Sequence, residues 1–252
     1  MTVNELYAKL NALIPTSLSC EWDNDGLMCC PDGAREVKKA LVCLDVTADA
    51  VRKAIDGGFD VIISHHPFIF KGLKSVTEND FIPKKAMELI RAGISVMSFH
   101  TRLDATVGGV NDKLASILGI ENTVPFGEGI GRIGELENET DALTFAKRIK
   151  DVLGAPAVFL ADSGKKVKRV AVLGGSGDDF ISEAIMLGAD AYVSGELGHH
   201  PMTDAPDMNI TLIEAGHFYT EQPVCEVLCE MIKKIDGSVV CEIYNSNRTV
   251  AI

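Results

Sequence analysis

The stretch "ALVCLDVTADAVRKAIDGGFDVIIS", residues 40–64, carries the pattern of one complete α/β unit. Two apolar runs, Val42–Asp45 and Val61–Ser64, have the composition of buried strands. Between them, Ala48–Asp56 has the apolar spacing of a helix with one buried face, and a G-x-D turn at 58–60 follows. The order strand, helix, strand predicts a βαβ unit and therefore an α/β fold.

The same pattern recurs 130 residues later, in "VAVLGGSGDDFISEAIMLGADAYVS", residues 170–194. Seven of the 25 aligned positions are identical, although generic βαβ units share apolar strands and Gly-Asp turns by chance. Downstream of each copy, a carboxylate follows a histidine by four residues, as His100/Asp104 and His217/Glu221. This second correspondence favours an internal pseudo-repeat.

Further strands and helices alternate along the chain, and they extend the prediction to two interlinked α/β lobes. We place the first lobe at residues 1–125 and the second at 126–252, with the segment near 215–252 returning to a cleft that both lobes share. The stretch at 120–139, rich in glycine and charge, is expected to join them. The other predicted strands are Ile94–Phe99, Val170–Leu173, Ala191–Ser194 and Ile210–Ile213, and the other helices are Pro83–Ala92, Asp178–Leu187 and Glu221–Lys234.

Composition excludes several classes of protein. Thirty-six acidic and 24 basic residues give a formal charge of −12, so the summed field repels nucleic acids and anionic membrane surfaces. No apolar run reaches the length of a membrane span. The N-terminus predicts a helix with a Thr2/Glu5 capping box rather than a targeting segment. Seven cysteines without a C-x-x-C pair indicate reduced thiols and a cytoplasmic protein.

All six histidines follow predicted strands, at the sheet edge where ligands bind in open α/β folds. For any single histidine, a hydrogen-bonded or surface role is the simpler interpretation. A histidine pair combined with two His-x-x-x-acid motifs instead favours two divalent metal ions held close together, with zinc, iron, manganese and nickel all compatible. The expected ligands are His65, His66, Asp104, His217 and Glu221.

At these residues the chain resembles the NIF-three-like family, whose bacterial members are commonly described as GTP cyclohydrolase type 2 homologues. The resemblance spans essentially the whole chain. The motifs that carry it are "WDNDGL" (22–27), "LDVT" (44–47), "ISHHPFIF" (63–70), "HTRLDA" (100–105), "GIGRIGEL" (129–136), "GGSG" (174–177) and "AGHFYTEQP" (215–223). It implies a dinuclear site on the same five ligands with His100 nearby, metals in the cleft between two lobes, and a ring-shaped homohexamer.

The resemblance implies a metal-dependent hydrolase of a nucleotide-like substrate, which opens the guanine ring of GTP and releases formate. His100 is the candidate general acid or base. Because two dications repel each other, an anionic bridge is needed, and we assign it to Glu221, whose side chain is longer than that of Asp104. Two alternatives remain, a metal chaperone or insertase without turnover and a regulatory scaffold. Open assignments are His199 and His200, which are expected to line the cleft, and the Gly174–Gly177 turn, which is either a phosphate cradle or a tight turn.

Overall fold

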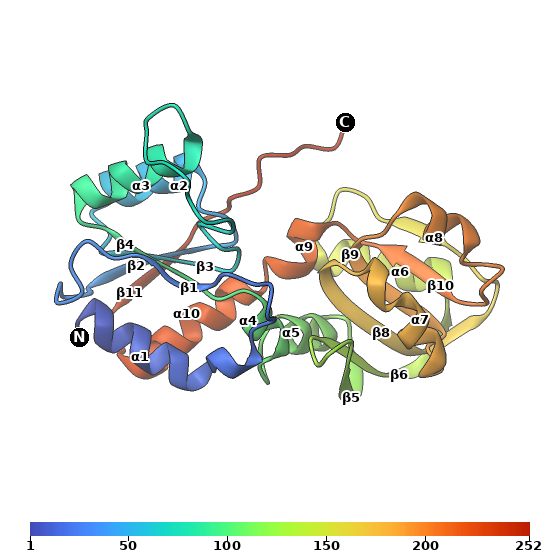
Figure 1. Ribbon diagram of the computed structural model, residues 1–252. Coiled ribbons are helices and arrows are strands. Elements are labelled where there is room, and N and C mark those ends of the chain that lie inside the picture. Colours follow the sequence, from blue (N-terminus) through green and yellow to red (C-terminus); the bar gives the residue numbers. More distant parts are fainter. The chain divides into compact units, whose positions relative to one another are not determined.

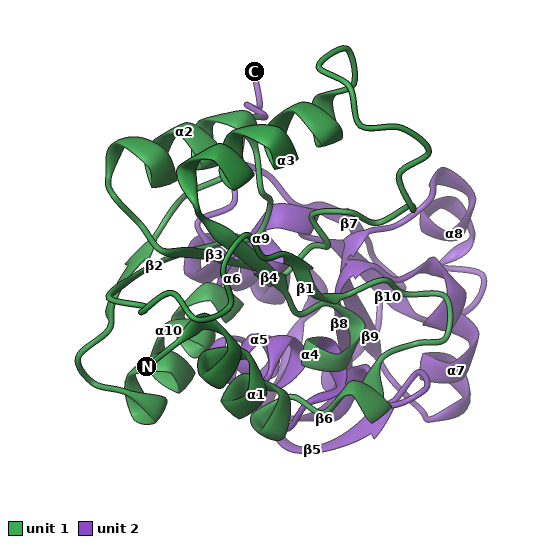
Figure 2. Cartoon of the chain, turned by 60° about the vertical axis from the view of Figure 1, so that its left-hand side comes forward, with its two compact units in different colours: residues 1–103, 224–248 green, residues 104–223, 249–252 purple.

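The computed structural model describes residues 1–252 and divides into two compact units (Figures 1 and 2). Unit 1 comprises residues 1–103 and 224–248, and unit 2 comprises residues 104–223 and 249–252. Each unit contains one sheet covered by helices, so the predicted α/β class is confirmed. The chain crosses from unit 1 to unit 2 inside a short helix, α4 (Thr101–Ala105).

Unit 1 has a five-stranded sheet in the order β1-β4-β3-β2-β11. Strands β11, β2, β3 and β4 are parallel, and β1 is antiparallel to β4. Helices α2 and α3 cover one face, while α1 and α10 cover the other (Figure 1). The strands are β1 (Gly26–Cys29), β2 (Lys39–Cys43), β3 (Val61–Ser64), β4 (Ser95–Ser98) and β11 (Val240–Ile243), and the helices are α1 (Val3–Leu13), α2 (Ala48–Asp56), α3 (Phe81–Ala92) and α10 (Val224–Ile235).

Local signals explain where these elements begin and end. The Thr2/Glu5 capping box starts α1 as predicted, since each residue bonds to the backbone N–H of the other. Thr47 caps α2 by accepting a hydrogen bond from the backbone N–H of Ala50. Helix α3 ends at Gly93, whose φ of 71° lies in the left-handed region that glycine adopts without strain.

Unit 2 has a six-stranded sheet in the order β5-β6-β8-β9-β10-β7. Strands β8, β9 and β10 are parallel to one another. The other three pairings are antiparallel: β5 with β6, β6 with β8, and β7 with β10. The strands are β5 (Ile120–Phe126), β6 (Gly131–Asp141), β7 (Phe159–Ala161), β8 (Lys166–Ser176), β9 (Ala191–Glu196) and β10 (Thr211–Glu214), and the helices are α5 (Val110–Ile117), α6 (Ala142–Leu153), α7 (Ile181–Met186), α8 (His199–Asp204) and α9 (His217–Glu221).

Both faces of this second sheet are covered, because side chains along β8 alternate between two cores. Val170 and Val172 pack with residues of α5 and α6, while Ala171 and Leu173 pack with residues of α7. A strand buried on both faces is apolar throughout, which is why Val170–Leu173 was recognisable as a strand from the sequence.

The structure differs from the sequence expectations at three places. Residues 120–139, expected to be a joining segment, instead form most of β5 and β6, an antiparallel pair within the second sheet. The single helix expected at Glu221–Lys234 is two helices, because Glu221 ends α9 and α10 begins at Val224, directly after Pro223. The expected lobe boundary at residue 125 lies inside unit 2, and β11 returns the chain to unit 1 by pairing with β2.

Two further features of the structure concern membrane spans and disulfides. No helix is both long enough and apolar enough to cross a membrane. No disulfide joins any of the seven cysteines.

Candidate metal centre

Three histidines gather at one edge of the unit 1 sheet. His65 and His66 follow the last residue of β3, and His100 follows β4, its parallel neighbour. The ring centroids of these histidines are 5.1, 5.4 and 5.8 Å apart, and their candidate ligand nitrogens lie within 4.8 Å of one another. The parallel pairing of two strands therefore brings together residues 34 positions apart. The result is a three-imidazole group, which suits a divalent transition metal.

Each of these histidines is held through the same ring nitrogen. The Nδ1 of His65 lies 2.9 Å from the carbonyl oxygen of Phe99. The Nδ1 atoms of His66 and His100 lie 2.8 and 2.9 Å from carboxylate oxygens of Asp45 and Asp23, respectively. These oxygens only accept hydrogen bonds, so Nδ1 is the protonated nitrogen in each ring and the lone pair belongs to Nε2. Metal-ligating histidines are commonly oriented in this way, so the group fits a metal.

Asp23 and Asp45 hold candidate ligand histidines, a contact that the sequence did not reveal. The side chain of Asp23 is fully buried and also accepts hydrogen bonds from the backbone N–H and hydroxyl of Thr101. Burial raises the pKa of Asp23, but hydrogen bonds from His100 and Thr101 outweigh it and hold the pKa well below its usual range. Asp45 also accepts a hydrogen bond from Ser246. Both aspartates lie in motifs of the family resemblance, "WDNDGL" and "LDVT", which was the available signal.

Unit 2 holds the other three candidate ligands. His217 and Glu221 occupy one face of α9, and the Nε2 of His217 lies 3.0 Å from Oε2 of Glu221. The Nδ1 of His217 lies 3.3 Å from a carboxylate oxygen of Glu196. Carboxylate oxygens of Asp104 and Glu221 lie within 4.8 Å of each other. This histidine-and-carboxylate set also fits a divalent ion.

The Gly174–Gly177 turn lies beneath His217 and Glu221. A Cβ atom at Gly175 would lie 2.3 Å from Oε1 of Glu221 and 3.4 Å from Nε2 of His217, and φ is +73° there. The backbone N–H of Gly174 donates to Asn111, and that of Gly175 donates to Thr220. The turn therefore supports the carboxylate and leaves these two N–H groups committed within the protein, which does not suit a phosphate cradle.

The remaining two histidines, and the basic residues close to the histidine motifs in the sequence, lie outside the metal-ligand groups. His199 and His200 are exposed on α8, and their rings contact each other at 5.5 Å. Arg102 is fully buried and lies 2.8 Å from Asp25, so it supports the fold instead of facing a substrate. Lys71 and Lys74 are exposed.

Comparison with known proteins shows the family to which this chain is similar. A family model described as Duf34/NIF3 (NGG1p interacting factor 3) matches residues 1–249. A protein of Clostridium acetobutylicum is 34% identical over 248 residues, covering 95% of this chain and 91% of that protein, and one of Clostridium perfringens is 32% identical, covering 95% and 94%. Both carry the name "GTP cyclohydrolase 1 type 2 homolog".

Solved structures also resemble this chain over nearly its whole length. The crystal structure of the Staphylococcus aureus hypothetical protein SA1388 matches with a TM-score of 0.91 at 28% identity, covering 100% of this chain and 99% of that one. Reduced HcgD from Methanocaldococcus jannaschii matches with a TM-score of 0.84 at 28% identity, covering 96% and 97%.

Proposed function

The chain belongs to the Duf34/NIF3 family, and from this premise we propose that it holds two divalent metal ions and hydrolyses a nucleotide-like substrate. The observation that carries the proposal is the histidine group of unit 1, in which all three Nδ1 atoms are engaged by acceptors. That arrangement fixes both the tautomer and the direction of each ring before any metal arrives.

We propose that the two ligand sets serve one dinuclear centre. The support comes from the chain itself, since His100 belongs to unit 1 and Asp104 to unit 2, yet only three residues separate them. Helix α4 includes Asp104 and begins directly after His100, and four residues of helix advance by only about 6 Å. In this centre His65, His66, Asp104, His217 and Glu221 are the ligands, with Glu221 as the bridge.

Bound divalent ions would supply Lewis-acid activation of water and of the substrate. The protein's own contribution is orientation and proton handling. Asp23 fixes the ring of His100 through Nδ1, so Nε2 is the nitrogen that exchanges a proton with a substrate. The side chain of His100 is 19% exposed, so a substrate can reach it.

Two aromatic side chains beside His100 support a substrate with a planar ring. The rings of Trp22 and Phe70 lie 6.1 and 6.3 Å from that of His100, and 6.2 Å from each other. Trp22 is 63% exposed and Phe70 is 46% exposed. Exposed aromatic faces can stack on a nucleobase, and GTP is the first substrate to test because of the names of the relatives.

The test combines metal analysis with turnover. We expect protein purified without added metal, then supplemented, to contain two ions per chain and to release formate from GTP or another nucleotide. Activity should disappear with a chelator. His66→Ala should lose metal, whereas His199→Ala, a matched exposed histidine outside the ligand sets, should retain it. One ion per chain despite supplementation would refute the dinuclear centre. Two exchangeable ions without turnover on a nucleotide panel would instead identify a metal carrier.

A further inference from the structure

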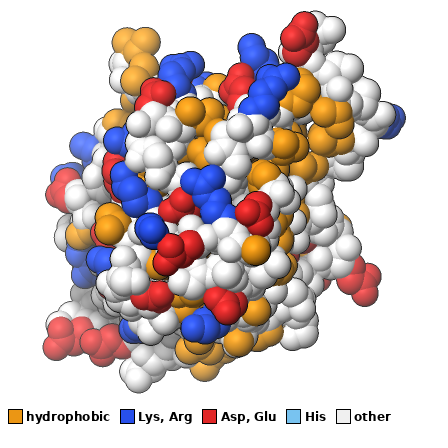
Figure 3. All heavy atoms as spheres, turned by 90° about the vertical axis from the view of Figure 1, so that its left-hand side faces the viewer, with side chains coloured by type: hydrophobic (Ala, Val, Ile, Leu, Met, Phe, Trp, Pro, Cys, Tyr) orange, Lys and Arg blue, Asp and Glu red, His pale blue; other side chains and the backbone are white.

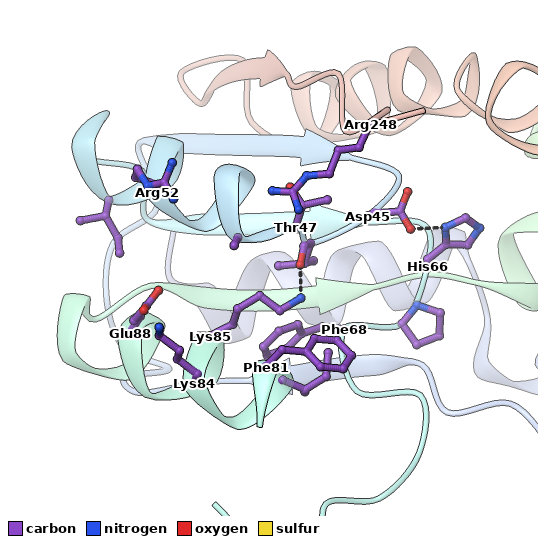
Figure 4. Close-up of a pocket in the computed structure, with 15 residues that line it drawn as sticks. Asp45, Thr47, Arg52, His66, Phe68, Phe81, Lys84, Lys85, Glu88 and Arg248 are labelled. Atoms are coloured by element: carbon purple, nitrogen blue, oxygen red, sulfur yellow. Dashed lines mark hydrogen bonds and ion pairs between the residues drawn. The ribbon is translucent and has the colours of Figure 1, made fainter. Parts of the chain in front are cut away.

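A cavity lies in unit 1, beside the histidine group of that unit. It has a volume of about 710 Å³, within the range of small-molecule sites. Residues 45–48, after β2, form one wall, and the beginning of α3 forms another (Figure 4). His66 reaches the cavity on the side of its ring that Asp45 holds.

The topology of the sheet makes this a place where ligands bind. From β2 the chain passes through α2 to β3 on one side, while the neighbour of β2 on the other side, β11, is reached through α10 on the opposite face. The strand order therefore reverses at β2, and ligands of open α/β sheets bind outside the carboxyl ends of the strands at such a point. Arg248, which follows β11, and Asp45, which follows β2, both line the cavity.

The walls combine aromatic faces with positive charge. Phe68 is buried and Phe81 is 72% exposed, so one ring forms the floor and the other stands at the mouth. Arg52 and Arg248 share Asp49 as their ion-pair partner. Lys84 and Lys85 also line the cavity. On the face drawn in Figure 3, basic and acidic side chains are interspersed, whereas the cavity is lined by four basic side chains and only two acidic ones, Asp45 and Glu88.

Lys85 is the most confined of these cations. Its ammonium group donates a hydrogen bond to the carbonyl oxygen of Val46 and lies 5.3 and 5.6 Å from the ring centroids of Phe68 and Phe81 (Figure 4). Burial lowers the pKa of Lys85, and the neighbouring charge of Arg248 lowers it further. An anion beside Lys85 would offset this repulsion and favour its charged form.

We propose that this cavity binds a nucleoside monophosphate, with the base against Phe68 and Phe81 and the phosphate beside Lys84 and Lys85. A phosphate monoester carries about −1.5 to −2 charge at neutral pH, which suits a lining with four basic and two acidic side chains. The site is distinct from the proposed metal centre, because it uses none of the Nε2 atoms and needs no bound metal. A nucleotide bound in this cavity would nevertheless affect the metal centre, because Asp45 both lines the cavity and holds His66.

Isothermal titration calorimetry on the full chain tests the proposal, with GMP, AMP, CMP and UMP as probes and with protein before and after chelator treatment. We expect at least one monophosphate to bind with a Kd below about 1 mM, and its nucleoside and ribose 5-phosphate to bind at least about tenfold more weakly. Phe81→Ala and Lys84→Gln should each weaken binding at least about fivefold. Both side chains are exposed, so these variants should fold.

The matched controls are Phe159→Ala and Lys147→Gln, which change an exposed phenylalanine and an exposed helical lysine in unit 2. Both should bind as the unchanged protein does. The proposal is overturned if none of the four probes binds, if the control variants lose binding equally, or if chelator treatment abolishes binding, since that last result would assign the nucleotide to the metal centre. Metal content, measured separately, keeps this outcome distinct from failure of the proposed hydrolase.

Discussion

At the scale of single residues, we expect the aspartates that hold His66 and His100 to contribute to metal affinity. Asp45 contacts Nδ1 of His66, the ring nitrogen that faces away from the proposed metal. An asparagine in its place presents a weaker acceptor, and its amide group can turn a donor toward the ring. We expect Asp45→Asn to weaken metal affinity about 10- to 100-fold, the usual cost of losing such a partner, with little change in the fold.

The measurement is competition for zinc against a chelating dye, with circular dichroism on the same samples. Asp56→Asn is the matched control, because Asp56 is an exposed aspartate at the end of α2, away from the histidines. Equal affinities of the Asp45→Asn variant and the control would remove Asp45 from the centre.

A substitution at Gly175 can move the candidate ligand Glu221 without replacing that residue. A Cβ atom there would overlap Oε1 of Glu221, so we expect Gly175→Ala to displace that carboxylate and reduce the bound metal. Gly188 is the control, since its φ of +77° is similarly positive but a Cβ atom there would meet nothing within 4 Å. Both variants should lose about 1 kcal/mol of stability from backbone strain. Metal loss in Gly175→Ala alone, by elemental analysis, is the expected result.

At the scale of elements, both repeat copies use an aspartate directly before the second strand to hold the first strand beside it. Oδ2 of Asp60 accepts hydrogen bonds from the backbone N–H groups of Lys38 and Lys39, and Oδ2 of Asp190 accepts them from Lys168 and Arg169. The spacings are 22 and 21 residues in both copies. Asp60 and Asp190 are one of the aligned identities, and the matching backbone donors, which lie outside the aligned stretch, extend the correspondence and support the proposal of an internal repeat.

We therefore expect Asp60→Asn and Asp190→Asn to lower the free energy of unfolding by similar amounts, about 1–3 kcal/mol each. Burial raises the pKa of Asp60, but the Lys38 and Lys39 N–H groups and Arg35 outweigh it and lower the pKa. A lowered folded-state pKa gives stability that is present above the unfolded value, near 4, and is lost as the pH falls through the folded value.

The difference in unfolding free energy between unchanged protein and Asp60→Asn should accordingly shrink as the pH falls below about 4. Urea titrations at pH 7 and at several acidic values measure it. A difference that does not depend on pH would show that the carboxylate charge contributes nothing.

The elements also show what could be predicted from sequence. Strand β3 was predicted at its exact bounds, because an apolar run buried on both faces has a local signature. Strand β5 was missed, since most of its side chains are exposed and its pairing with β6 leaves no apolar period. The histidines were found because they follow such strands. Asp23 was not assigned a role, because its partner, His100, lies 77 residues away and no local sequence pattern predicts that contact.

At the scale of the whole molecule, we expect the oligomeric state not to depend on bound metal. The family resemblance implies a homohexamer. Because metal that binds only the folded chain stabilises it by mass action, about 2.7 kcal/mol at a hundredfold excess over Kd, chelation should lower the melting temperature. We expect sedimentation velocity of the chelated protein still to give a hexamer, since the ligands proposed here all belong to one chain. Dissociation to monomers on chelation would instead make the metal part of the assembly.

The last prediction concerns the roles of the two acids, both contributed by unit 2. Two dications about 3.5–4 Å apart repel each other, so loss of the anion between them should release both. If Glu221 is that bridge, Glu221→Gln should retain neither ion, whereas Asp104→Asn and His217→Ala should each lose chiefly one. The conservative Gln and Asn replacements keep the side-chain shape, so circular dichroism should be unchanged. Elemental analysis of the three variants decides the matter: two ions retained by Glu221→Gln with none in Asp104→Asn would exchange the roles of the acids.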